Sequence, residues 1–164
     1  MAYSLQKHLL YNEWANSQFA ELLRNVDDAV YFLPAKSSFA SIAKTVIHIW
    51  GAQHVWYRRF EGESLRSFPV RDETDKHSAL DGLIQSSNEI LKFVENKDEA
   101  FLSSTYAYNN LKGDPFEDSY EETLYHIVNH GTYHRGQIVT MLREAGVTSL
   151  VSTDLIHYLR TLKK

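Results

Sequence analysis

The sequence predicts an all-α protein built as a four-helix bundle. Only three prolines and seven glycines interrupt its 164 residues, so long helices are expected. Apolar residues in the first segment recur mostly at steps of three to five, close to the repeat of an α-helix. Four such segments with short connections are typical of a bundle, in which facing helices bury one common core.

The first two helices are predicted on either side of a short connector. The first covers about residues 4–25, and residues 26–34 form the connector with a short helical turn. Ser37 or Ser38 can cap the second helix, which runs up to Gly62, a residue that commonly ends helices. Because this helix is apolar on most sides, we expect it to be the most buried.

A loop and a change of pattern surround the third helix. Residues 65–72 are predicted as loop, and the third helix covers about residues 74–96. Residues 101–111 are rich in Ser, Thr and Tyr, and the following Lys-Gly-Asp-Pro at 112–115 is a turn sequence. This part predicts a small β-hairpin or another extended excursion between the third and fourth helices.

The fourth long helix has a clear beginning and end. Ser119 and Glu122 form a capping-box pattern at its start, and Gly146 follows its end. A short last helix is predicted at about residues 154–162. The sequence has no internal repeat and no low-complexity segment, so residues 1–164 are predicted to form one domain.

Composition narrows the classes of function. The chain carries 17 basic and 21 acidic residues, a net charge of −4, which gives no reason to expect nucleic-acid or membrane partners. It has no cysteine, which excludes disulfides, thiolate metal sites and a cysteine nucleophile. There is no signal-peptide pattern and no apolar run of membrane-spanning length, so a cytoplasmic location is expected.

Three of the eight histidines lie on the fourth predicted helix. His130 and His134 are four residues apart, so they share one face and lie about 6 Å apart along the axis. Two imidazoles at this spacing can bind one metal ion. His126 is eight residues from His134, about 12 Å along the axis, too far for all three to share an ion. His126 is therefore expected beside the site or as a core histidine with a local partner.

A third ligand is expected from another helix, because catalytic zinc-type sites usually have three protein ligands and one open position. The second helix offers His48 and His54, and the first helix offers His8. His48 and His54 are six residues apart, about 240° around the helix, so both cannot face one ion. Helical periodicity does not choose among the three candidates.

The residues around the histidine pair exclude two enzyme classes. A zincin needs Glu directly after the first histidine, where this chain has Gly131. A di-iron bundle needs Glu-x-x-His, and neither Glu121 nor Glu122 is followed by His at that spacing. Arg135 is expected as a surface or interface cation, and Gly136 in mid-helix suggests close helix packing.

Four stretches of the sequence form a recognisable pattern. Residues 126–146 read HIVNHGTYHRGQIVTMLREAG, and residues 11–16 read YNEWAN. Residues 48–56 read HIWGAQHVW, and a further stretch extends from Thr153 to Tyr158. Together they resemble the DinB-like (DinB/YfiT) metalloprotein family, and residues 126–146 are similar to the last long helix of that family. The resemblance covers nearly the whole chain.

The resemblance implies an up-down-down-up bundle, often a homodimer, that binds a metal through three histidines. Carried over to this sequence, the ligands are His48, His130 and His134. Family members with known activity are similar to thiol-dependent transferases or a related isomerase. Asn12, together with His126 and Gln137, is expected near the ligands or in the substrate pocket.

These observations predict a metal-dependent enzyme of the thiol-dependent transferase type, or a hydrolase-like enzyme, acting on small electrophilic molecules. The expected cofactor is one divalent ion of zinc, nickel or iron, with a low-molecular-weight thiol as cosubstrate. The alternative is a non-catalytic metal-binding or stress-response scaffold. A homodimer is the expected assembly, and the sequence assigns no catalytic side chain beyond the metal ligands.

Overall fold

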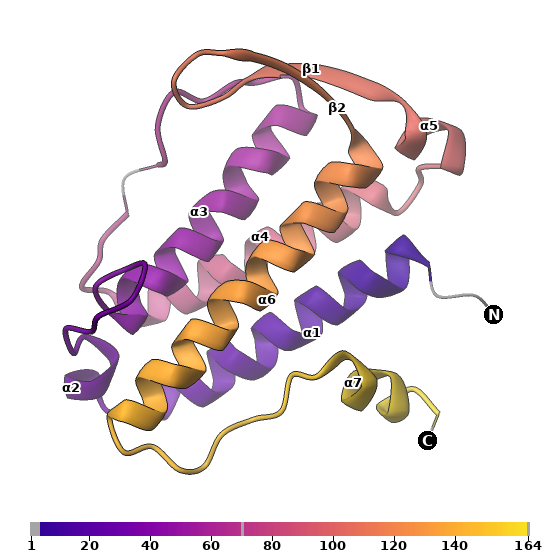
Figure 1. Cartoon of the computed structure of the whole chain (residues 1–164). Coiled ribbons are helices and arrows are strands. Elements are labelled where there is room, and N and C mark those ends of the chain that lie inside the picture. The colour runs from indigo at the N-terminus through magenta and orange to yellow at the C-terminus, as the bar shows by residue number, and fades with distance from the viewer. Residues whose placement is uncertain (1–3, 70, 164) are drawn as a thin grey trace.

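Four long helices form the body of the protein in a computed structural model, which describes residues 4–69 and 71–163 (Figure 1). They are α1 (Leu5–Arg24), α3 (Ile42–Phe60), α4 (Lys76–Val94) and α6 (Tyr120–Glu144). Each predicted long helix is present, and the four pack as a bundle, as the spacing of apolar residues predicts.

The long helices follow an up-down-down-up course. Figure 1 shows α1 and α6 running in one direction and α3 and α4 in the other. Helix α1 packs against α4 and α6, and α3 packs against the same two helices. Since α3 and α4 are parallel, residues 61–69 and 71–75 return along the length of the bundle before α4 begins.

Short elements occupy the connections. Strands β1 (Thr105–Asn109) and β2 (Pro115–Ser119) form the predicted antiparallel hairpin between α4 and α6. Helix α2 (Asp28–Tyr31) is the expected turn in the first connector. Helix α7 (Leu155–Thr161) closes the chain, and α5 (Glu99–Ser103) is a short helix that the sequence pattern did not predict.

The prediction that Ser37 or Ser38 caps α3 is wrong. The cap is Ser41, whose hydroxyl accepts a hydrogen bond from the amide of Lys44. Ser38 is used elsewhere, because its hydroxyl accepts a hydrogen bond from the Gln137 side chain on α6. At the start of α6 the predicted capping box of Ser119 and Glu122 is formed.

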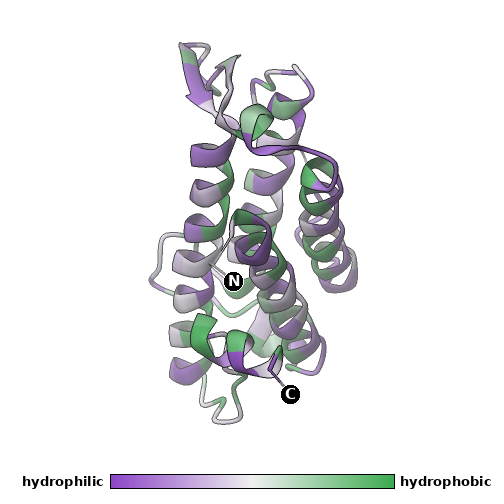
Figure 2. Cartoon of the chain, turned by 90° about the vertical axis from the view of Figure 1, so that its right-hand side faces the viewer, coloured by the Kyte–Doolittle hydropathy of each residue, from purple (hydrophilic) through white to green (hydrophobic). Residues whose placement is uncertain are grey.

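The core consists of two apolar clusters with a buried polar layer between them. The helices turn apolar residues inward and polar residues outward (Figure 2). One cluster includes Phe19 and Leu142, and the other includes Leu9 and Leu124.

Within the described residues, no helix is both long enough and apolar enough to cross a bilayer.

Close helix packing occurs at Gly82 and not at Gly136, where the sequence suggested it. A Cβ atom on Gly82 would lie 2.2 Å from the Trp50 ring, so a glycine is needed for α3 and α4 to approach. A Cβ atom on Gly136 would meet no atom of the described residues within 4 Å. Gly136 is exposed, because it lies on the side of α6 that faces a surface groove.

Candidate metal centre

The fold brings three histidines from two helices together. His48 comes from α3, and His130 and His134 come from consecutive turns of α6. One ring nitrogen from each lies within 4.8 Å of the other two. The Nε2 atoms of His48 and His130 are 2.9 Å apart. In the described part of the chain this is the one group of three or more His, Asp or Glu side chains with metal-binding spacing.

The donor set suits a borderline divalent ion. Nitrogens bound about 2.1 Å from a tetrahedral ion lie about 3.4 Å apart, which falls between the 2.9 Å separation and the 4.8 Å limit here. All three donors are imidazoles, and no carboxylate joins the group among the described residues. Such ligands suit zinc, nickel and iron, and three of them leave a coordination position free.

Burial keeps two of the rings in the neutral form that a metal requires. Burial lowers the pKa of His130 to about 3, and the nearby His134 and His48 contribute to the lowering. Burial also lowers the pKa of His48 to about 4, with a smaller contribution from His134. Both rings are therefore uncharged at neutral pH, with nitrogen lone pairs available to a cation.

A hydrogen bond fixes the orientation of the third ring. Nδ1 of His134 donates to Oε1 of Gln137 at 2.8 Å, because an amide oxygen can only accept. This leaves Nε2 of His134 as the metal-binding atom. Gln137 in turn donates from Nε2 to the Ser38 hydroxyl at 2.7 Å. The loop before α3 therefore helps to hold a side chain on α6.

Three aromatic side chains, here called the aromatic rim, surround the histidines. The ring of Phe39 stacks on His48 with centroids 4.0 Å apart, and Phe68 lies 5.6 Å from the same ring. Tyr133 lies edge-on to His134 at 4.9 Å. Phe68 is 39% exposed and Tyr133 is 62% exposed, so the rim provides apolar surface that a ligand can reach.

His126 lies beside the three-histidine group and is not part of it. Its ring is 5.8 Å from that of His130 and 5.6 Å from that of Trp56, measured between centroids. With Trp56, Asp118 and Glu122 it lines a cavity of about 280 Å³. This places it where the helix spacing predicted, one turn from His130 and away from His134.

The other candidate residues lie elsewhere. His54 and His8 are outside the three-histidine group. Asn12 is buried, donating to Gln53 at 3.0 Å and accepting from Arg135 at 3.0 Å, so its hydrogen bonds belong to the polar layer of the core. Gln137 does contact the histidine cluster, through its hydrogen bond with His134.

The expectation that Arg135 is a surface or interface cation is wrong. The side chain is only 2% exposed and donates from Nη1 to Asn12 and Asn16 on α1. Burial lowers its pKa, and Tyr11 acts in the opposite direction. The sequence analysis missed this burial, and the signal that could have revealed it is the pair Asn12 and Asn16, four residues apart on an otherwise apolar helix face.

No comparable sequence signal marks Phe39 and Phe68 of the aromatic rim, or Ser38. Phe39, Phe68 and Ser38 lie in loops, where no periodicity relates a side chain to a distant helix. Gly51 on α3 allows Phe68 to pack there, because a Cβ atom at this position would lie 2.8 Å from Cδ1 of Phe68.

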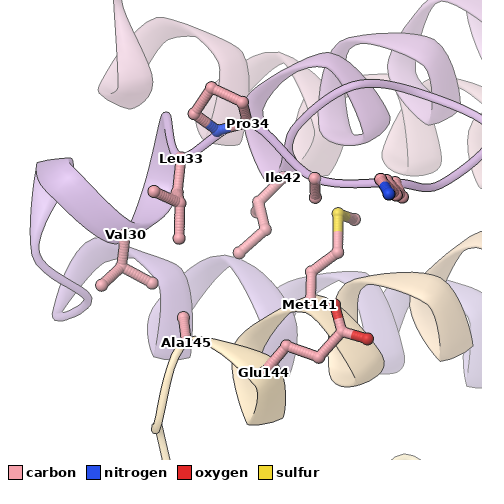
Figure 3. Close-up of a pocket in the computed structure, with 9 residues that line it drawn as sticks. Val30, Leu33, Pro34, Ile42, Met141, Glu144 and Ala145 are labelled. Atoms are coloured by element: carbon pink, nitrogen blue, oxygen red, sulfur yellow. The ribbon is translucent and has the colours of Figure 1, made fainter.

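A separate cavity lies near the end of the bundle beside α2 (Figure 3). It has a volume of about 280 Å³, and apolar side chains such as Leu33, Ile42 and Met141 form most of its wall. None of the described histidines lines it, and its charged lining residues are Glu144 and Lys36. This lining is not suited to metal chemistry, so the histidine cluster remains the functional candidate.

Known proteins share both the sequence pattern and the fold. The sequence model of the DinB family matches residues 1–161. The chain belongs to the DinB family. It is 30% identical over 157 residues to protein DinB of Bacillus subtilis (strain 168), covering 91% of this chain and 90% of that protein.

A solved structure has the same fold. YfiT from Bacillus subtilis, described as a probable metal-dependent hydrolase with an unusual four-helix bundle topology, matches with a TM-score of 0.68. The match covers 90% of this chain and 92% of YfiT at 14% sequence identity. At 14% identity, the similarity shows the shared fold alone.

Proposed function

We propose that this DinB-family protein is a metal-dependent enzyme in which His48, His130 and His134 hold one divalent ion. The observation that carries the proposal is a cluster of three imidazoles without a fourth protein ligand in the described residues. Structural zinc sites normally have four protein ligands, whereas catalytic sites leave one position open. The composition of the cluster therefore favours catalysis over a purely structural ion.

The reaction we propose is transfer of a thiol to a small electrophilic molecule. When bound, a divalent ion would favour the thiolate form of a coordinated thiol and polarise an electrophile. The chain has no cysteine, so the thiol must come from a low-molecular-weight cosubstrate. No carboxylate joins the three histidines among the described residues, which argues against a carboxylate general base beside them.

The aromatic rim favours a flat or apolar electrophile as the substrate. Phe68 and Tyr133 expose ring surface beside the histidines, and such surface binds apolar molecules by excluding water. Hydrolysis is the second candidate, favoured by the similarity to YfiT, which is described as a probable metal-dependent hydrolase. Water would then take the place of the thiol.

The test is an assay of metal-loaded protein with a panel of thiols and electrophiles, including aryl esters. Zinc, nickel and iron(II) are loaded separately. The expected result is thiol-dependent product formation that the His130→Ala variant loses and the His54→Ala variant keeps. Product formed equally well without thiol would identify a hydrolase. Rates no higher than those of the free ion in every arm would leave a non-catalytic metal-binding scaffold.

A further inference from the structure

A second groove lies on the opposite side of α6 from the histidines. Thr132 follows His130 by two residues, about 200° around the helix, so the two side chains point to opposite sides. The groove has a volume of about 570 Å³ and lies between α6 and the segment that leads from α6 to α7. The Tyr11 hydroxyl holds this segment in place by donating a hydrogen bond to the Thr153 carbonyl at 2.9 Å.

A buried cation without an acidic partner lies under one end of the groove. Arg135 lines the groove and donates to the neutral oxygens of Asn12, Asn16 and Thr132. Its Nε–H has no hydrogen-bond partner among the described residues. Across residues 4–69 and 71–163, no carboxylate forms an ion pair with it. A buried, uncompensated guanidinium is unfavourable, and a nearby anion would relieve that cost.

The polar groups of the groove are suited to receive such an anion. The Thr132 hydroxyl accepts from Nη2 of Arg135 at 3.0 Å, so its own proton remains available to a ligand. Thr132 is exposed, whereas Arg135 is buried, so the threonine is the group that a ligand would touch. Asp154 is the single acid among the described lining residues, and Arg143 lies about 16 Å further along α6 than Thr132, toward the other end of the groove.

The rest of the groove is open and largely apolar, with Ser152, Thr153 and Asp154 as the polar lining residues before α7. Val139, Leu150, Val151 and Leu155 form its walls. Gly136 lines the groove beside Val139, and a side chain there would enter the space, because a Cβ atom would meet no described atom within 4 Å. The space therefore suits a short hydrocarbon chain that continues from the polar end.

We propose that this groove binds a small carboxylate with an apolar tail. The carboxylate accepts from the Thr132 hydroxyl above the positive charge of Arg135, and the tail lies along Gly136 and Val139. The site is separate from the metal, so it does not depend on the proposed reaction. It would give the protein a second ligand on the far side of the helix that carries two of the histidines.

The first test compares three ligands of equal length: hexanoate, hexanol and hexylamine. Each is titrated into metal-loaded protein and followed by two-dimensional NMR. Hexanoate is expected to bind at least tenfold more tightly than the other two, with shifts at Thr132, Gly136 and Val139. It should bind equally to metal-free protein, which separates groove binding from coordination of the carboxylate to the metal. Equal affinity for all three ligands, or no binding of hexanoate, would overturn the proposal.

The second test fills the groove by substitution. Gly136→Leu is expected to abolish hexanoate binding, and Thr132→Val to weaken it about tenfold. Thr140→Leu is the matched control, since Thr140 is exposed on the same helix and does not line the groove. Wild-type affinity in Gly136→Leu would place the ligand elsewhere and overturn the proposal. A change of oligomeric state in that variant, without hexanoate binding in the wild type, would make the groove an interface between copies instead.

Discussion

His130 and His134 owe their proximity to helix geometry, whereas His48 joins them only through the packing of α3 on α6. The environment of each ring then determines its chemistry. Burial lowers the pKa of His48 and His130 and keeps them neutral, and Gln137 orients His134 through Nδ1. Each effect leaves a ring nitrogen with a free lone pair that can bind a cation. The environment of each side chain therefore supports metal binding.

Single substitutions should separate ligands from bystanders. His48→Ala, His130→Ala and His134→Ala are each expected to lose most bound metal, because two remaining imidazoles form a weak site. His54→Ala is expected to keep it, since His54 is outside the cluster. Metal content is measured by elemental analysis of tag-free protein reconstituted with zinc. Equal loss in His54→Ala would contradict the ligand assignment.

The metal-free protein should become less stable as the pH falls below about 6.5. The pKa values of His48 and His130 lie at about 4 and about 3, below the unfolded value of 6.5. Between these values the unfolded chain binds more protons than the folded one, so acid favours unfolding. Urea unfolding at pH 7 and pH 5 measures the difference in free energy of unfolding.

The His48→Asn, His130→Asn double variant provides the control for this pH effect. It removes both low-pKa rings, so its loss of stability between pH 7 and pH 5 should be smaller than that of the wild type. A wild-type protein that is as stable at pH 5 as at pH 7 would show that the two rings are not held neutral by burial.

Two glycines within helices show that the packing around a helix decides what a substitution there does to stability. At Gly82 the Trp50 ring occupies the place of a Cβ atom, whereas at Gly136 the place is empty of described atoms. Gly82 lets α3 and α4 approach, and Gly136 leaves the groove on α6 open. A glycine inside a helix therefore has a packing role in one element and a surface role in another.

Alanine at the two positions should change stability in opposite directions. Gly82→Ala is expected to destabilise by about 1–3 kcal/mol, because Trp50 must move. Gly136→Ala is expected to stabilise by about 1 kcal/mol, the difference in helix propensity. Thermal or urea unfolding of metal-free protein measures both. Destabilisation by Gly136→Ala would show that the position is packed.

At the scale of the whole molecule, a layer of buried polar side chains joins the four helices at mid-height. Gln53 on α3 is its centre, accepting from Asn12 and Asn16 on α1. It donates to Ser86 on α4 at 2.8 Å, and Arg135 connects the asparagines to α6. Because buried polar groups must be paired, this layer specifies the position of the four helices relative to one another along the bundle axis.

Removing the centre of this layer should destabilise the whole bundle. Gln53→Met keeps the size of the side chain and removes its hydrogen bonds, leaving buried partners unpaired. The expected loss is about 2 kcal/mol or more. Gln85→Met is the matched control, because Gln85 is exposed on α4 and its side chain donates to Glu89 on the same helix. Equal stability of the two variants in urea unfolding would mean that the layer contributes little.

The sequence by itself determined the four long helices, the hairpin, the capping box of α6 and the proximity of His130 to His134. These features depend on local spacing, which the chain carries in its own order. The choice of His48 from the second helix came from family resemblance, because apolar residues lie on most sides of that helix and their spacing did not choose between His48 and His54.

Only the tertiary structure decided the rest. It buried Arg135 and left Gly136 open. It placed the helix cap at Ser41 and not at Ser37 or Ser38, and it paired Ser38 with Gln137. It also brought Phe39 and Phe68 from loops to the histidines. Each of these outcomes depends on which helix faces which, and contacts between distant segments leave no periodic trace in a single sequence.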